Sequence, residues 1–188
     1  VKQGSTLCNV CESIGLGFLE DGFESCKECG SQSGSRQLWR YLTESMFTYR
    51  RLSALAVGLQ DSAIKRLWRS QFQGSLYSPI EFSELLAMGN RVDNQNGRTH
   101  LIYLNGEMDF ENSYSKMASE VSRLLVSGGV LLFQLSADST MESVKEFGES
   151  LEAVGVRFCR RIHYLNPNNE FGSLPMCEYK NNRIDCPK

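Results

Sequence analysis

Two Cys-x-x-Cys pairs constrain the N-terminal part of this chain more strongly than any other feature of the sequence. The pairs are Cys8 with Cys11 and Cys26 with Cys29, and fourteen residues lie between them. Four thiolates at this spacing suit one tetrahedral Zn²⁺, because each pair can hold the ion from a tight turn. Four cysteine ligands leave no open position for water, so the pattern predicts a structural zinc ion rather than a catalytic one.

The segment between the two pairs has the pattern of a short β-hairpin. Ile14–Phe18 and Phe23–Ser25 are its predicted strands, with an acidic, glycine-containing turn between them. We therefore predict a zinc ribbon over residues 1–32. Two disulfides are the alternative, but they need an oxidising compartment, and the chain has seven cysteines, an odd number.

Composition sets wide limits on the rest of the chain. Its 188 residues, 41% of them hydrophobic, are enough for one ordinary core and a small additional domain. No apolar run approaches the length that crosses a bilayer, so we predict no membrane partner. The net charge of −2 is unevenly distributed, because residues 36–72 carry seven basic and only two acidic side chains.

Residues 36–74 are predicted to form a basic helical hairpin. Apolar residues at intervals of three and four run from Leu38 to Ala56, and a second helix follows up to Gly74. A Gly/Ser-rich segment, residues 30–35, is predicted to be a flexible link to the ribbon. The candidate contacts to nucleic acid or to an acidic partner are Arg40, Arg50, Arg51, Lys65, Arg66 and Arg69.

Aromatic residues are interleaved with these cations. They are Trp39, Tyr41, Phe47, Tyr49 and Trp68. Basic residues among aromatic ones are typical of a nucleic-acid surface, whereas a charge run on a helix is more often its solvated face.

The order of these N-terminal features resembles one known family. The features come in a fixed order along the chain. They are an acidic turn, then Cys26-Lys-Glu-Cys29-Gly-Ser-Gln32, then a helix with Trp39-Arg-Tyr41, and last a helix with Lys65-Arg-Leu-Trp68. This order is similar to the start of the RNA polymerase I initiation factors related to transcription factor IIB, which are TATA-binding-protein-associated factors. The resemblance covers residues 6–72 and implies docking onto the polymerase machinery in the nucleus.

From Thr99 the sequence alternates between strands and helices. The predicted strands are Thr99–Asn105, Val130–Leu135, Val156–Leu165 and Met176–Lys180. Helical stripes run from Tyr114 to Leu125 and from Val144 to Val154, and a shorter helix from Pro79 to Gly89 precedes a polar loop over residues 90–97. This order predicts a parallel sheet, with the last two strands as an antiparallel hairpin.

The second half of the chain resembles the second half of class I S-adenosylmethionine-dependent methyltransferases. The segment from Met117 to Phe133 contains Arg-x-Leu-x-x-Gly-Gly, the pattern that leads into the fifth strand of those enzymes. The resemblance covers residues 98–180. Those enzymes bind their cofactor with a Gly-rich turn after the first strand, but the one Gly-x-Gly sequence here, Gly15-Leu-Gly17, lies inside the ribbon. We therefore predict that this chain alone does not bind S-adenosylmethionine.

Two further groups of residues are weaker candidates for chemistry. Asn105, Glu107 and Asp109 follow the strand end where the methyltransferase family places acceptor-binding groups, and a plain polar loop is the alternative. Cys159 and His163 lie four residues apart on a predicted strand. With Cys177 or Cys186 they suggest a second metal site or a thiol nucleophile, against the alternative of an ordinary cysteine and a surface histidine.

The sequence as a whole predicts an α/β protein. Its parts are a Cys₄ zinc ribbon (1–32), a basic helical hairpin (36–74) and a partial Rossmann-like, methyltransferase-like domain (78–188) without the cofactor-binding half. The first hypothesis is a non-catalytic zinc-binding module that docks onto a transcription complex or another nucleic-acid-associated complex in the nucleus. The alternative is a divergent or truncated S-adenosylmethionine-dependent methyltransferase whose ribbon recognises the substrate.

Overall fold

The computed structural model of this chain describes residues 8–12, 16–18, 24–45, 52–59, 62–72, 85, 97–105, 113–134, 141–162 and 176–181. The chain divides into two compact units. Unit 1 comprises Val1–Arg51, Gln60–Gln73 and His163–Ser173, and unit 2 comprises Leu52–Leu59, Gly74–Ile162 and Leu174–Lys188. Both units are therefore built from segments that are not continuous in the sequence.

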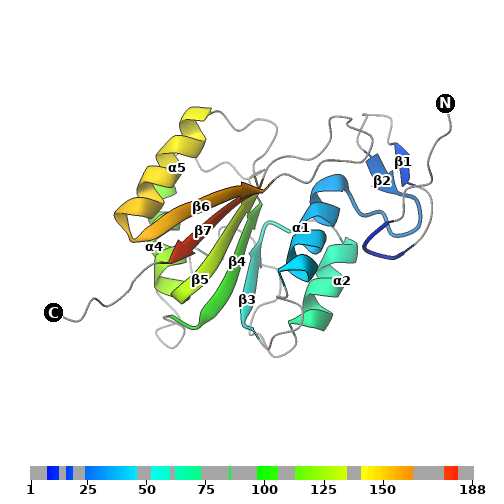
Figure 1. The fold of residues 1–188 in the computed structure, drawn as a ribbon, viewed down its shortest axis with the longest axis horizontal. Helices are drawn as coiled ribbons and strands as arrows, with labels where there is room; N and C mark the ends of the chain where they lie inside the picture. The colour runs from blue at the N-terminus through cyan, green and yellow to red at the C-terminus, as the bar shows by residue number, and fades with distance from the viewer. Residues whose placement is uncertain are drawn as a thin grey trace. The chain divides into compact units, whose positions relative to one another are not determined.

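Unit 1 contains the β-hairpin predicted next to the cysteines. β1 (Leu16–Phe18) pairs antiparallel with β2 (Glu24–Cys26), so the second strand ends at a cysteine. The same unit contains the helices α1 (Ser33–Glu44) and α2 (Ser62–Gln71), which are labelled in Figure 1. The prediction of a short antiparallel hairpin is confirmed.

The segment between the hairpin and α1 has regular backbone hydrogen bonding. Ser25 forms an isolated antiparallel bridge with Gln32, and α1 begins at the next residue, Ser33. The backbone N–H of Arg36 donates to the carbonyl of Gln32 at 3.0 Å and closes the first turn of the helix. The predicted flexible link over residues 30–35 is therefore wrong.

Unit 2 is built on a five-stranded sheet with the order β3-β4-β5-β7-β6. The strands are β3 (Ala54–Val57), β4 (Thr99–Asn105), β5 (Leu125–Gln134), β6 (Val156–Ile162) and β7 (Met176–Asn181). β3, β4 and β5 are parallel, and β7 is antiparallel to both β5 and β6. The parallel sheet and the antiparallel final hairpin are confirmed. The insertion of β7 between β5 and β6 is a feature that the sequence did not predict.

Strand β3 corrects the largest error of the sequence-based prediction. The first predicted helix ran to Ala56, but α1 ends at Glu44, and Ala54–Val57 pairs with β4. A short apolar run is compatible with a helix or with a buried strand, and periodicity alone does not separate them. All four residues of β3 are fully buried, as expected for a parallel strand. A strand of the sheet therefore lies between α1 and α2 in the sequence, and the two helices are not an uninterrupted hairpin.

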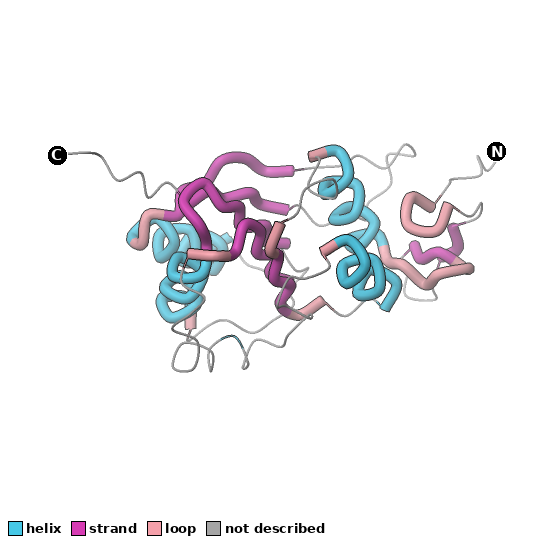
Figure 2. The backbone as a smooth tube through the Cα atoms, turned by 90° about the horizontal axis from the view of Figure 1, so that it is seen from below, coloured by secondary structure: helices cyan, strands magenta, loops and turns pink. Residues whose placement is uncertain are grey.

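Helices α4 (Tyr114–Leu124) and α5 (Met141–Ala153) lie together on one face of the sheet, as Figures 1 and 2 show. Both helices were predicted. The strand residues of the core beneath them are Leu55, Val57, Ile102, Leu104, Leu131, Phe133, Cys177 and Tyr179. They alternate along each strand, so this face of the sheet is predominantly apolar. The ring of Phe147 from α5 packs against that of Phe133, with 5.0 Å between the ring centroids.

Two predicted elements fall almost entirely outside the described residues. Of the helix predicted from Pro79 to Gly89, only Leu85 is described, and it is helical and fully buried. Of the polar loop over residues 90–97, only Gly97 is described. None of the described helices has the length and apolar character needed to cross a membrane.

The Gly-Gly sequence after α4 lies inside β5 rather than at the end of the helix. Between the pairs Thr99–Leu125 and Leu101–Val130, β5 advances by five residues while β4 advances by two. The extra residues form a bulge, in which Gly128 has a φ of +76°. Only glycine adopts this backbone conformation without strain.

We expect Gly129→Ala to be more destabilising than Gly128→Ala. A Cβ on Gly129 would lie 2.9 Å from the carbonyl oxygen of Val126 and 3.2 Å from that of Thr99, so backbone has to move. At Gly128 a Cβ would meet nothing within 4 Å, and only the positive φ is unfavourable. The expected losses in free energy of unfolding are about 3 kcal/mol for Gly129→Ala and about 1 kcal/mol for Gly128→Ala. Urea unfolding measures both, and equal losses would contradict the steric argument.

Candidate functional site

The four cysteines predicted to bind a metal lie together in unit 1. Their sulfur atoms are all within 4.8 Å of one another. Cys8 Sγ lies 3.8 Å from Cys29 Sγ, and Cys11 Sγ lies 3.6 Å from Cys26 Sγ. Sulfur atoms 2.3 Å from a central zinc ion would be about 3.8 Å apart at the corners of a tetrahedron, so these positions fit a metal ion. They are too far apart for disulfides, which need about 2.05 Å.

The two cysteine pairs have the same local backbone geometry. The N–H of Glu12 donates to the carbonyl of Cys8 at 2.7 Å, and the N–H of Gly30 donates to the carbonyl of Cys26 at 2.8 Å. Glu12 and Gly30 also share a positive φ, 60° and 71°. Each pair is therefore presented by one closed turn that ends in a left-handed residue, which explains how short segments can direct two sulfur atoms to one point.

Burial raises the pKa of the Cys29 thiol from 9.0 to about 11. Its hydrogen bonds with the hydroxyl and the backbone N–H of Ser31 lower it, and those with the thiols of Cys11 and Cys26 raise it. At neutral pH this thiol carries its proton in the metal-free chain. A metal ion must therefore displace at least this proton when it binds.

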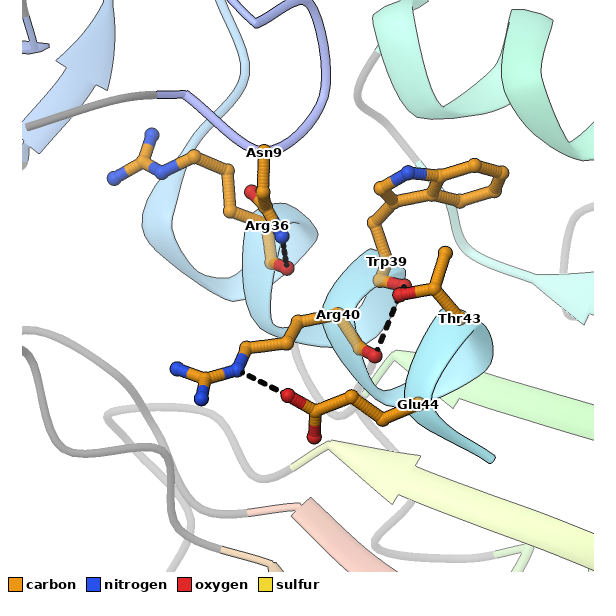
Figure 3. Close-up of polar contacts among 6 residues, drawn as sticks. All are labelled: Asn9, Arg36, Trp39, Arg40, Thr43 and Glu44. Carbon is orange, nitrogen blue, oxygen red and sulfur yellow. Dashed lines mark hydrogen bonds and ion pairs between the residues drawn. The ribbon is translucent and has the colours of Figure 1, made fainter. Parts of the chain in front are cut away.

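The predicted basic contacts are divided between α1 and α2. Arg40 on α1 donates through Nε to Glu44 Oε1 at 2.7 Å, so its charge is partly compensated (Figure 3). Lys65, Arg66 and Arg69 lie on α2, where Arg66 and Arg69 are exposed. Arg50 and Arg51 lie outside the described residues.

The described members of the predicted aromatic set do not form a surface for stacking bases. Trp39, Tyr41 and Trp68 are all buried, with Trp68 fully so. Phe47 and Tyr49 lie outside the described residues. The described aromatic side chains lie on the buried face of amphipathic helices. Their alternation with the basic residues in the sequence therefore follows from helix periodicity and does not indicate a nucleic-acid surface.

The carboxyl ends of β3, β4 and β5 form a second candidate site. Gly58 follows β3 directly and has a φ of +70°, and Asn105 at the end of β4 donates through Nδ2 to the carbonyl of Gly58 at 3.1 Å. The hydroxyl of Tyr103 donates to Gln134 Oε1 at 2.5 Å at the end of β5. In open α/β sheets, ligands bind beyond this edge. Asn105 was predicted here, whereas Glu107 and Asp109 lie outside the described residues.

Gly58 is one of the residues at this site, with Tyr103 and Gln134, that the sequence pattern did not identify as candidates. The pattern predicts it as the end of a helix, because the apolar run before it also fits helical periodicity. The apolar run Ala54–Val57 is followed directly by a glycine. This pattern fits a buried strand and its turn as well as it fits the end of a helix, so it could have indicated the site.

The cysteines of the last two strands do not join a second metal group among the described residues. Cys159 is exposed on β6 and Cys177 is buried on β7, whereas His163 and Cys186 lie outside the described part of the chain. The group of metal-ligating side chains found in the described residues is the four-cysteine site.

Comparisons with known proteins identify the fold. No family model matches the chain, and no curated protein matches its sequence. A methyltransferase from Mesorhizobium loti, S-adenosylmethionine-dependent, is similar with a TM-score of 0.51 and 9% identity, over 77% of this chain and 97% of that one. A protein from Galdieria sulphuraria assigned as a sarcosine dimethylglycine methyltransferase has a TM-score of 0.50 and 9% identity, over 84% and 91% of the two chains. A protein from Listeria monocytogenes assigned as an S-adenosylmethionine-dependent methyltransferase has a TM-score of 0.50 and 8% identity, over 78% of this chain and 97% of that one.

The chain therefore has the Rossmann-like fold of these methyltransferases. At this low identity the likeness shows the fold and not the activity. The three matches cover 77% to 84% of this chain. The segment predicted to resemble a methyltransferase, residues 98–180, is only 83 of the 188 residues, so the structural similarity extends beyond the predicted half of the sheet. The comparisons give no support to the resemblance between the N-terminal part and RNA polymerase I factors.

We expect the purified chain to bind one metal ion, and Cys26→Ser to lose most of it, because three sulfur ligands bind more weakly than four. Cys159→Ser is the matched control, since this exposed cysteine on β6 lies outside the four-cysteine site. Elemental analysis of both variants gives the metal content per chain. Full occupancy in the Cys26→Ser chain would contradict the assignment.

The same site should bind its metal less tightly as the pH falls. Because at least the Cys29 proton is displaced, the apparent affinity should weaken at least about tenfold for each pH unit between pH 8 and pH 6. Titration calorimetry in two buffers of different ionisation enthalpy counts the released protons, and a count of zero would contradict the displacement.

Proposed function

We propose that this chain is a divergent S-adenosylmethionine-dependent methyltransferase with a zinc-binding N-terminal unit that recognises the substrate. The observation that carries the proposal is the turn at Gly58. It follows the first parallel strand of the sheet and lies beside the end of β4, at the edge where ligands of such sheets bind.

The turn at Gly58 suits the approach of a ligand to bare backbone. Glycine has no Cβ, and its positive φ turns the chain sharply at the end of β3. The amide of Asn105 holds the carbonyl of this turn, so Asn105 positions the turn from the neighbouring strand. S-adenosylmethionine supplies a methyl group to a nucleophile when bound, and a turn of this kind fits its amino-acid moiety.

The fit to this cofactor is incomplete within the described residues. A carboxylate for the ribose hydroxyls is the other usual requirement of such a site. After β3 the described residues, Gly58 and Leu59, are not acidic, and the residues after β4 and β5 lie outside the described part of the chain. Glu107 and Asp109, which lie outside the described residues, remain the candidates from the sequence for binding the acceptor. The sequence-based prediction that the chain alone does not bind S-adenosylmethionine rested on the lack of a first-half βαβ unit with a Gly-rich turn and a carboxylate for the ribose. β3 and the turn at Gly58 supply a first strand and a glycine turn, which supports the proposal, whereas the carboxylate stays unassigned.

Zinc is the metal that best suits the four-cysteine site. Four thiolates in a tetrahedron favour Zn²⁺ or iron, and a closed set of four ligands is typical of a structural ion. In the proposed enzyme the ion has no part in methyl transfer. It holds together the N-terminal segment, which is too short to fold on a hydrophobic core of its own.

We expect the full chain to bind S-adenosylmethionine with a micromolar dissociation constant in isothermal titration. Gly58→Ala should weaken this binding by about tenfold or more, because the added Cβ strains the turn and narrows it. Gly97→Ala is the matched control, since Gly97 also has a positive φ, of 61°, but precedes β4 at the opposite edge of the sheet. Absence of saturable binding to the wild-type chain would overturn the proposal.

A second function, docking onto a nucleic-acid-associated complex, is favoured by the charge of α2. The helix contains Lys65, Arg66 and Arg69 and no acidic residue, and none of the three forms an ion pair within the described part of the chain. Its apolar residues Ala63, Ile64 and Trp68 are buried. The cations are thus available to phosphate groups. A polymerase complex and the nucleus remain part of this second proposal.

We expect any affinity for nucleic acid to fall steeply with salt, because binding releases counterions. Arg66→Gln combined with Arg69→Gln should reduce the slope of log K against log salt by about 2. Lys116→Gln is the control, since Lys116 is exposed on α4 in unit 2. Fluorescence anisotropy with single-stranded and double-stranded oligonucleotides measures the slopes. No binding at low salt would leave α2 with an ordinary solvated face.

A further inference from the structure

Ser31 connects the four-cysteine site to its surroundings. The residue is fully buried, and its Oγ lies 3.4 Å from Cys8 Sγ and 3.1 Å from Cys29 Sγ. It therefore contacts one sulfur atom from each cysteine pair. In the metal-free chain the Cys29 thiol donates to this oxygen. With thiolates around a metal ion, the hydroxyl has to become the donor, because a thiolate only accepts.

The carbonyl of Ser31 accepts two hydrogen bonds. The backbone N–H of Cys26 donates to it at 3.0 Å, and Arg36 Nη1 donates to it at 2.5 Å. Arg36 is a residue of α1 and is mostly buried. A buried guanidinium is costly unless it is hydrogen-bonded, so this contact fixes α1 to the second cysteine pair.

Arg36 also contacts the first cysteine pair. Asn9, which lies between Cys8 and Cys11, donates through Nδ2 to the carbonyl of Arg36 at 2.9 Å (Figure 3). The side chain of Arg36 thus reaches one cysteine pair and its backbone reaches the other. Arg36 is therefore, with Ser31, a residue that connects the two cysteine pairs.

The N-terminus of α1 has few stabilising features of its own. Its N-cap residue, Gln32, makes no side-chain capping hydrogen bond, and the first turn contains no acidic residue. A zinc ion with four thiolates carries a net charge of −2, since 2 − 4 = −2. This negative charge would lie close to the positive end of the helix dipole, with Arg36 as a further compensating charge.

We infer that Arg36 and Ser31 are positioning residues of the metal centre, and that metal binding stabilises α1 through them. The inference rests on the proposed metal site. Loss of the metal removes the restraint on both cysteine pairs, and with it the contacts that fix the first turns of α1. The helix that bears Arg40 then becomes dependent on metal occupancy, whereas α5 in the other unit does not.

Hydrogen exchange of the full chain, with and without Zn²⁺, tests this dependence. We expect the amides from Arg36 to Glu44 to exchange at least about tenfold faster after metal removal, and those of α5 to change less than about twofold. If the metal binds and α1 exchanges at the same rate in both states, the inference is overturned while the metal site stands. If no metal binds, the proposed zinc site fails as well.

Variants of Arg36 separate its role from general packing. Arg36→Ala keeps all four sulfur ligands, so it should still bind one metal ion, with affinity reduced by about ten- to a hundredfold. It should also shift the sulfur-to-metal charge-transfer band of the Co²⁺-loaded chain. Arg36→Lys should restore part of the affinity, because an ammonium group keeps the positive charge and can still donate to a carbonyl. Arg40→Ala, on the exposed face of the same helix, is the control. If Arg36→Ala matches Arg40→Ala in both affinity and spectrum, Arg36 is not a positioning residue.

Discussion

The architecture of unit 2 depends on the parallel pairing between β3 and β4. β3 is four residues long and is fully buried, so its backbone groups need partners away from water. Pairing with β4 provides partners along one side of β3, and it also protects one edge of β4. The same pairing brings the turn at Gly58 next to Asn105. This short strand thus completes the sheet, and its carboxyl end forms part of the site to which we assign ligand binding.

The two faces of this sheet differ in chemistry. The face under α4 and α5 is predominantly apolar, and burial of that face contributes much of the stability of the unit. Alternation along the strands places Tyr103, Gln134 and Glu178 on the opposite face, where all three are buried. The Tyr103–Gln134 hydrogen bond and the Lys180–Glu178 ion pair compensate part of the cost of burying them. Buried polar groups therefore occur on the face opposite α4 and α5, whose packing is less purely hydrophobic.

The N-terminal part of unit 1 is stabilised by interactions that differ from those of unit 2. Closed turns and four convergent sulfur atoms replace a hydrophobic core, and contacts of Ser31 and Arg36 extend that order into α1. This arrangement explains why a segment rich in glycine and serine forms the start of a helix instead of a flexible link. Helix propensity is a weak preference, and specific tertiary contacts override it.

The sequence alone was sufficient for features that depend on local spacing. The four cysteines, the hairpin between them, α4, α5 and the strands β4 to β7 were all identified, because each has a long or distinctive pattern. The candidate residue Asn105 was identified in the same way, from its place at the end of a buried strand.

Only the tertiary structure decided the features that depend on distant partners. Ala54–Val57 is too short for its period to distinguish strand from helix, so its hydrogen bonds with β4, some 47 residues away, made the choice. The burial of Trp39 and Tyr41 and the bridging role of Arg36 also depend on which groups meet in space. The sequence determined which residues can bind a metal or line a sheet, and the non-local hydrogen bonds determined where Gly58 and Arg36 stand relative to them.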